Sequence, residues 1–465
     1  KIVIDATELG DVMGKLKVPY RVGMDSRYDT GESFAPEKAN NIIQDLTYVV
    51  VLKDFGANAN KTIKKPVGYD PSEFDCCCDV QDPASHDNTP KIDCSQMITY
   101  GKLPNGKYMI NWPKCGNDIY MNIIEMSDVD RKTALEKAKL HSLRFIYHLQ
   151  TKLGFKNLGI ADDEFPTADR LPMIAYHRES RRLDGKVTLT LNDVTSPYTQ
   201  KTALYRTGIA VGDYTIDHHH LKNPDAPQID FVKIKVPSYN IPLGALVPKN
   251  TEGLIVAEKS VSVTNIVAGA SRLQPVVLGI GQAAGALAAT AVLSSTDPSN
   301  INIRAVQNAL LESNAYLMPF IDVKPDDASF KVIQKIGATG ILKGTGLSYK
   351  WANQTWFYPE LPVSEWDFVN GLKSFYPAFA ELHPSGNLVN ASFMAGTIKA
   401  IGKKEVSEGQ ILDFLKQQNF KELTAESQLS RRMVAHALDH FLDPFKAEID
   451  FTGKTQSNQQ PNNNN

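Results

Sequence analysis

The densest group of side chains that could bind an anion or transfer a proton follows a short apolar run that ends at Tyr176. The chain there reads His177-Arg178-Glu179-Ser180-Arg181-Arg182. If this segment is a strand, alternation places Arg178 and Arg182 on one face and His177 on the other. One interpretation is a strand end that offers guanidinium groups to a cofactor or to an anionic or polyhydroxylated substrate. The other is a solvated strand end with internal ion pairs, and both remain open.

A second group is Asp217-His218-His219-His220. Histidines beside an aspartate can bind a metal ion or act as acid and base near neutral pH. Consecutive residues of a strand point to opposite sides, so at most His218 and His220 could share one ion. This arrangement favours contacts with a substrate or an organic cofactor over a metal centre. We predict His177, Arg178, His218 and His220 as candidate catalytic or orienting residues, and no metal site.

A third pattern, Gly279-Ile-Gly281-Gln-Ala-Ala284, matches the dinucleotide fingerprint G-x-G-x-x-A. The fingerprint requires a preceding strand and a following βαβ unit. Here Pro275 leaves three apolar residues before the first glycine, and Ser-Ser-Thr-Asp-Pro follows the helix. We therefore favour a closely packed helix whose N-terminus faces an anionic group.

Composition excludes several classes of protein. Lysine plus arginine (50) nearly balances aspartate plus glutamate (52) in 465 residues, which gives no field suited to nucleic acid. The longest apolar stretch, 275–293, is interrupted by Gly and Gln, so no membrane span is expected. The five cysteines lack C-x-x-C spacing and leave open one or two disulfides in an exported protein or free thiols.

The elements that must position these residues follow from periodicity. Helices are predicted over 128–153, with a cap at Ser127 or Asp128, and over 274–289, 303–311, 406–416 and 427–441. Short strands are predicted at 171–176, 186–191, 229–236 and 253–257, and 58–105 is interpreted as a surface insertion. The tail 456–465 is predicted to be disordered.

Five blocks of sequence, in this order, carry a resemblance to one family. They are Ile4-Asp5-Ala6-Thr7-Glu8-Leu9-Gly10-Asp11, the segment 176–182, Gly212-Asp213-Tyr214-Thr215-Ile216-Asp217-His218-His219, Tyr239-Asn240-Ile241-Pro242-Leu243-Gly244-Ala245-Leu246, and Leu254 to Gly285 with its Arg272-Leu-Gln274-Pro275 and Gly281-Gln282-Ala-Ala-Gly285 motifs. Over roughly residues 1–315 the chain resembles bacterial FAD-dependent oxidoreductases, some of which are labelled xanthan lyase-like.

The resemblance implies an α/β chain with a glutathione-reductase-like Rossmann fold and a strand-rich substrate region. Its segments would be 1–57 and 251–318 in the FAD-binding domain and 58–250 in the insertion and substrate domain. Beyond them, the change of composition after Pro319 and the two later helical patterns predict a helical C-terminal module over 319–450, followed by a tail over 451–465. The resemblance also implies FAD as the cofactor. The residues that would border FAD are Ala6, Thr7, Gly10, Asp11, Ala257, Ser260, Arg272, Gln274, Gly281 and Gln282.

Two departures from the family pattern shape the expectations. The family's Gly-rich strand–turn–helix, which normally clamps FAD, has no counterpart before Lys1, and this predicts an N-terminally incomplete chain that holds FAD weakly by itself. Glu258 stands where relatives often have glycine.

The resemblance predicts hydride transfer from a substrate to flavin, and the family label suggests a saccharide-type substrate. The alternative is a non-catalytic carbohydrate-binding or surface protein built on a degenerate flavoprotein half, which the aromatic residues Trp351, Trp356 and Trp366 favour. Export to the periplasm or outside the cell is slightly favoured over the cytoplasm.

Overall fold

The computed structural model describes residues 1–79, 92–376, 383–402 and 405–456. The predicted disorder of 456–465 therefore falls almost wholly outside the described residues. The chain divides into two compact units. Unit 1 comprises residues 1–39, 181–218 and 229–465, and unit 2 comprises residues 40–180 and 219–228. The predicted boundary near residue 318 lies inside unit 1.

Unit 1 begins with a parallel pair of strands that come from the first and the last of the sequence blocks that carry the family resemblance. Strand β1 (Val3–Asp5) pairs with β12 (Leu254–Val256), and Asp5 lies opposite Val256. Parallel strands need a long crossover connection, which the intervening chain supplies. The mixture of such strands with packed helices confirms the α/β class, and β12 confirms the strand predicted at 253–257.

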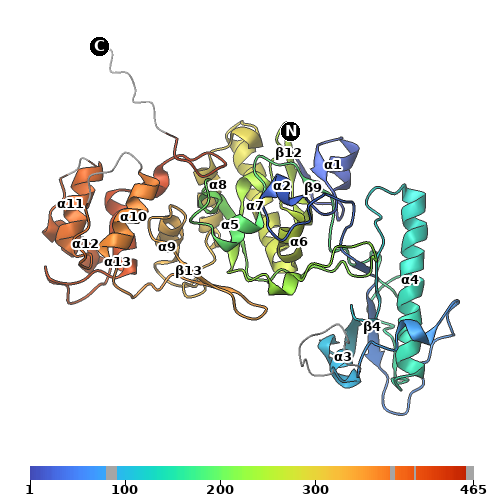
Figure 1. Ribbon diagram of the computed structural model, residues 1–465. Helices are drawn as coiled ribbons and strands as arrows, with labels where there is room; N and C mark the ends of the chain where they lie inside the picture. Colours follow the sequence, from blue (N-terminus) through green and yellow to red (C-terminus); the bar gives the residue numbers. More distant parts are fainter. Residues whose placement is uncertain (80–91, 377–382, 403–404, 457–465) are drawn as a thin grey trace. The chain divides into compact units, whose positions relative to one another are not determined.

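The core of unit 1 is organised around α7 (Gln274–Leu293), the helix that carries the false fingerprint. It packs against β10 (Gly208–Gly212), β12 and α8 (Ile303–Glu312). Figure 1 shows α7 and α8 side by side. By length and composition alone α7 could cross a membrane, because it has 20 residues and an 18-residue window of it has a mean hydropathy of 1.9. The expectation of no membrane span therefore stays a prediction. The packing of α7 in unit 1 accounts for one apolar face, and the other face is exposed.

Three predicted strands are absent from the described residues of unit 1 and unit 2. Residues 231–233 form a 3-10 turn. The strand was predicted there because the exposed Lys233 and Lys235 alternate with buried apolar residues, as in a half-buried strand. Residues 186–191 run into the short helix α5 (Leu191–Thr195) and 171–176 contribute a single bridge at Tyr176. Met173 and Ile174 are largely exposed, so that apolar run does not belong to a core.

The other elements of unit 1 are short or belong to its C-terminal half. They are α1 (Asp11–Lys15), β2 (Tyr20–Arg21), α2 (Arg27–Thr30), β9 (Arg182–Leu183), β11 (Tyr239–Pro242), α6 (Asn265–Ser271), α9 (Phe330–Gly337), β13 (Thr345–Leu347), β14 (Gln354–Trp356), α10 (Glu365–Phe375), α11 (Ala391–Gly402), α12 (Glu408–Gln417) and α13 (Arg431–Phe441). The helices predicted at 303–311, 406–416 and 427–441 are confirmed. The last two begin later than predicted because Ser407 and Ser430 cap them.

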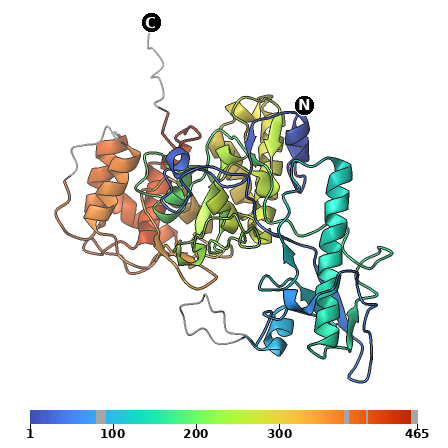
Figure 2. The same cartoon turned by 45° about the vertical axis from the view of Figure 1, so that its right-hand side comes forward.

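Unit 2 contains a four-stranded antiparallel sheet and one long helix, which lie side by side in Figure 2. The sheet order is β5 (Lys102–Leu103), β6 (Lys107–Ile110), β4 (Val50–Asp54) and β8 (Leu158–Ile160). Separate from it, β3 (Leu46–Thr47) pairs with β7 (Asp118–Ile119), and α3 (Cys94–Tyr100) completes the unit.

The long helix α4 (Asp128–Thr151) confirms the prediction over 128–153. The Ser127 side chain accepts a hydrogen bond from Asp130 N, as an N-cap should. Phe145, Ile146 and Leu149 are fully buried at the spacing of one helix face. Gly154 follows with a φ of +83°, a conformation that glycine adopts readily.

Two disulfides link the cysteines of unit 2. They join Cys76 to Cys115 and Cys78 to Cys94, and Cys77 remains a buried thiol whose pKa burial raises to about 11. Of the alternatives open from the sequence, disulfide formation holds for four of the five cysteines.

We expect the Cys76–Cys115 link to stabilise unit 2 by about 4 kcal/mol, because it closes a loop with a sequence separation of 39 residues in the unfolded chain. Urea unfolding of the Cys76→Ser/Cys115→Ser variant, followed by the fluorescence of Trp112, measures this directly. Trp112 suits the measurement because its indole donates to Cys77 O inside the same unit, at 2.9 Å. A loss below about 1 kcal/mol would show that the link does not constrain the unfolded chain.

Candidate functional site

The first part of the candidate site is the turn between β1 and α1 in unit 1. Asp5 is buried at the end of β1, and its carboxylate accepts from Thr7 N at 3.0 Å, Thr7 Oγ1 at 2.6 Å and Met13 N at 2.7 Å. The hydroxyl of Thr7 accepts in turn from Asp11 N at 2.7 Å. One buried carboxylate thus holds the whole turn in shape, while Ala6 at its edge is exposed.

Gly10 brings this turn into contact with the last sequence block. It has a φ of +64°, and a Cβ atom there would lie 2.9 Å from Met13 Cε, 3.2 Å from Ser260 Oγ and 3.3 Å from Arg181 Cβ. Both the conformation and the space therefore require glycine. Arg181 completes the contact by pairing with Asp11 at 3.0 Å. Predicted cofactor residues some 250 positions apart in sequence thus lie together.

The segment after β12 continues the same surface. Ala257 N donates to Asp5 O at 2.8 Å, which extends the parallel ladder by one residue. Glu258 has a φ of +61°, so the position where the resembled family often has glycine keeps a glycine-like backbone. The buried Lys259 pairs with Glu8 at 2.9 Å and with Glu258 at 2.7 Å. Burial raises the pKa of Glu8, and the charge of Lys259 opposes that rise.

The second part of the site lies where α6 meets α7. Arg272 is buried; its guanidinium donates to Asp217 O at 3.1 Å and pairs with the Asp217 carboxylate at 3.3 Å. His218 Nε2 lies 2.8 Å from Asn265 Oδ1, and its ring stacks on Phe231 at 4.4 Å between centroids. His218 therefore has a fixed ring orientation within unit 1.

The N-terminal half of α7 exposes the remaining predicted cofactor residues. Gln274, Gly281 and Gln282 are exposed, and Leu278 on the same face is 74% exposed. A Cβ at Gly281 would meet no described atom within 4 Å, so packing among the described residues does not require this glycine. Among the described residues no side chain caps the first turn, which leaves its N–H groups and the positive end of the helix dipole directed outward.

Unit 2 holds a separate buried network around Arg178. Its guanidinium donates to Asp45 O at 2.9 Å, Thr47 Oγ1 at 3.0 Å and Asn111 Oδ1 at 3.0 Å. It also forms an ion pair with Asp118 at 3.2 Å. Arg178 is 2% exposed, so these contacts anchor it inside unit 2.

His219 also belongs to this network, although the alternation expected for a strand favoured its neighbours His218 and His220 as site residues. Its Nδ1 lies 3.1 Å from Asp118 Oδ2, and Thr47 Oγ1 donates to the other oxygen of the same carboxylate. Burial opposes ionisation of Asp118, yet the hydrogen bond from His219 and the charge of Arg178 hold its pKa below the ordinary value. No sequence signal marked Asp118, which lies 101 residues from His219.

The other two predicted histidines are buried in unit 2. His220 Nε2 lies 3.1 Å from Pro227 O, and His177 is 6% exposed. The four predicted catalytic residues are thus divided between units, with His218 in unit 1 and His177, Arg178 and His220 in unit 2.

Asp45 in the Arg178 network provides a prediction on pH. Burial raises its pKa to about 6, whereas an unfolded aspartate titrates near ~3.9. The folded unit therefore holds a proton that the unfolded chain releases, so its free energy of unfolding falls as the pH rises from ~4 to ~6 and stays lower above that. Asp45→Asn should abolish this loss, which amounts to at most about 3 kcal/mol.

Urea unfolding of unit 2 at about pH 4 and pH 7 checks the prediction. Asp54→Asn, at the exposed end of β4, is the matched control and should leave the loss between the two pH values intact. An unchanged loss in Asp45→Asn would assign it to another group.

Comparison with known proteins agrees with this arrangement. The family model described as FAD dependent oxidoreductase matches residues 1–310. No curated protein and no solved structure matches the chain significantly. Since the family match covers two thirds of the chain, the protein belongs to the FAD-dependent oxidoreductase family, and its cofactor is FAD.

The residues of unit 1 fit this cofactor. The tight turn at Gly10, the exposed Ala6 and the uncovered first turn of α7 belong to elements that contact one another, because β1 pairs with β12 and α7 packs on β12 and the turn after it. Outward-facing N–H groups and small side chains suit the approach of an anionic or electron-rich group.

Proposed function

We propose that this chain acts as an FAD-dependent oxidoreductase that oxidises a saccharide-type substrate. The observation that carries the proposal is the meeting of Gly10, Ser260 and Arg181, which joins the first and last parts of the family match. The match over 1–310 also favours an oxidoreductase over the alternative of a non-catalytic surface protein.

When bound, FAD supplies the acceptor for a hydride from a substrate C–H bond. The residues of this chain have two tasks. Ala6 and Thr7 would border the cofactor, while Gly10 and Ser260, which are buried against each other, would hold their turn in place. The N–H groups of the first turn of α7 at Gln274 would stabilise negative charge beside the cofactor. The second task is to remove the proton of the hydroxyl group whose carbon is oxidised.

We propose that His218 removes this hydroxyl proton as the general base. It lies in the same unit as the cofactor residues, and Asn265 fixes its ring through the 2.8 Å contact. A neutral imidazole held in one orientation is a suitable general base near neutral pH. The guanidinium of Arg178 already contacts four partners in unit 2. Arg178 would therefore position Asp118 and His219 rather than bind the substrate directly.

Two disulfides in unit 2 support the further proposal that the protein is exported, since such links persist in oxidising compartments.

Anaerobic reduction of the bound flavin tests the proposed function. Protein expressed from its own gene and loaded with FAD is mixed with a panel of sugars and sugar alcohols, and the flavin absorbance is followed. We expect at least one sugar to bleach the flavin, and His218→Gln to slow bleaching by about 100-fold or more with flavin still bound. His440→Gln, on α13 far along the chain, is the control. Bleaching by none of the sugars would remove the saccharide assignment, and an unchanged rate in His218→Gln would remove the base.

A further inference from the structure

Unit 1 contains a cavity that the proposed oxidoreductase chemistry does not use. Its volume is about 430 Å³, which lies within the range of small-molecule sites. Three stretches of chain line it: 189–205 around α5, 235–240 leading into β11, and 318–355 with the β13–β14 hairpin. The last stretch lies beyond the family match, so the cavity is built jointly by the family region and the C-terminal half.

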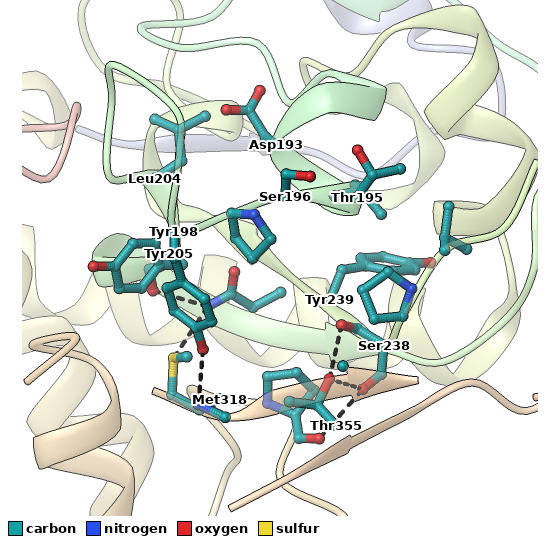
Figure 3. A pocket seen from close by; sticks show the side chains of 18 of the residues that line it. Asp193, Thr195, Ser196, Tyr198, Leu204, Tyr205, Ser238, Tyr239, Met318 and Thr355 are labelled. Atoms are coloured by element: carbon teal, nitrogen blue, oxygen red, sulfur yellow. Dashed lines mark hydrogen bonds between the residues drawn. The ribbon is translucent and has the colours of Figure 1, made fainter. Parts of the chain in front are cut away.

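The lining combines aromatic rings with neutral hydroxyl groups. Figure 3 shows Tyr198 and Tyr205 on one side of the hollow, with Ser238, Tyr239 and Thr355 on the other. Further hydroxyl groups come from the end of α5 and the loop that follows it. They belong to Thr195, Ser196 and Thr199.

Charge contributes little to this lining. The two charged residues of the lining are Asp193 and Lys235. Asp193 belongs to the capping box of α5, where its carboxylate accepts hydrogen bonds from Thr190 N at 3.0 Å and Thr190 Oγ1 at 2.6 Å. Lys235 is exposed to solvent. A phosphate or carboxylate ligand would therefore find no buried cation to pair with in this cavity, and a neutral ligand suits it better.

The two walls are held rigidly. Tyr198 and Tyr205 meet edge to face at 4.8 Å, and Gly344 N donates to Tyr198 Oη at 3.2 Å. On the other side Ser238 Oγ donates to Thr355 Oγ1 at 2.8 Å, and Thr355 Oγ1 donates to Ser238 O at 3.2 Å. These bonds fix β14 to the start of β11, so the cavity is already formed without a ligand.

We infer that this cavity is a binding site for a neutral saccharide of one or two rings. Sugar hydroxyls need neutral donors and acceptors, and the apolar C–H faces of a sugar ring pack on flat aromatic rings. The hairpin that lines the cavity also presents Trp351, 56% exposed and stacked on Tyr214 at 5.8 Å, as a further flat surface for a longer chain. This site requires no flavin and does not depend on the proposed catalytic residues.

The test is saccharide binding to the full protein without added FAD, measured by saturation-transfer NMR and titration calorimetry. The probes are maltose, cellobiose, chitobiose and glucose, with glucose 6-phosphate as a charged comparison. We expect at least one neutral probe to bind in preference to the phosphate. Ser196→Trp, which places an indole in the cavity, should weaken that binding by about tenfold or more.

Ser313→Trp is the matched control, because Ser313 likewise follows a helix as its C-cap and is exposed, but lies outside the cavity. It should bind as the unmodified protein does. Failure of all neutral probes to bind, preference for glucose 6-phosphate, or equal affinity in the Ser196→Trp variant would each overturn the assignment. Because no flavin takes part, a negative result here leaves the test of flavin reduction unaffected.

Discussion

Arg182→Met should destabilise unit 1 by about 3–5 kcal/mol, the largest effect we expect from a single substitution. The Arg182 side chain is fully buried, and its guanidinium donates to Gly23 O at 2.6 Å and to Val263 O at 3.2 Å. It also pairs with the buried Asp25 at 3.1 Å. Removing the cation leaves the two carbonyl groups without this donor in a site that water does not reach. The Asp25 carboxylate would keep its ion pair with the partly exposed Arg21 at 3.3 Å and the hydrogen bond from Asn265 N at 2.7 Å, but it would lose its pairing with a fully buried cation, which is costly.

Urea unfolding at neutral pH measures this loss, with the exposed Arg170→Met as the control for the chemical change. The double variant Arg182→Met/Asp25→Asn should recover part of the stability, because it also removes the buried charge that would then be balanced by Arg21 alone. A loss below about 1 kcal/mol in Arg182→Met would show that Asp25 and its surroundings relax without the arginine.

Asp5→Ala should abolish stable retention of FAD, with affinity weakened by about tenfold or more. Three donors, Thr7 N, Thr7 Oγ1 and Met13 N, would lose their acceptor, and the turn that carries Gly10 would no longer be fixed. Asp5→Asn keeps one acceptor oxygen, so its effect should be smaller.

Equilibrium dialysis of FAD against the protein expressed from its own gene measures this effect. Asp29→Ala, exposed on α2 of the same unit, is the control and should bind FAD normally. Equal FAD affinity in the Asp5→Ala protein would show that the β1–α1 turn does not belong to the cofactor site.

The long helices were predictable because their apolar faces repeat over several turns. The pattern through Phe145 and Leu149 defined α4, and small residues from Gly279 to Ala289 defined α7. Short strands were less predictable, since five to eight residues contain too few repeats to separate a strand from a 3-10 turn. Residues 229–236 are the clearest example.

The pairing of distant residues was not readable from local pattern. The resemblance placed Gly10 and Ser260 in one site, but the contact of Arg181 with Gly10 and the ion pair of Lys259 with Glu8 depend on tertiary packing. His219 was not predicted as a site residue, because alternation along a strand places only His218 and His220 on the same side. The segment is irregular, so the alternation argument did not apply to it.

The most direct test of the central claim, that unit 1 carries this protein's part of an FAD site, is the visible absorption spectrum of the protein expressed from its own gene after desalting. We expect flavin bands near about 375 and 450 nm in that protein and their loss in Asp5→Ala. A colourless protein that added FAD cannot reconstitute would contradict the account, because the residues gathered around Gly10 and α7 would then serve some other purpose.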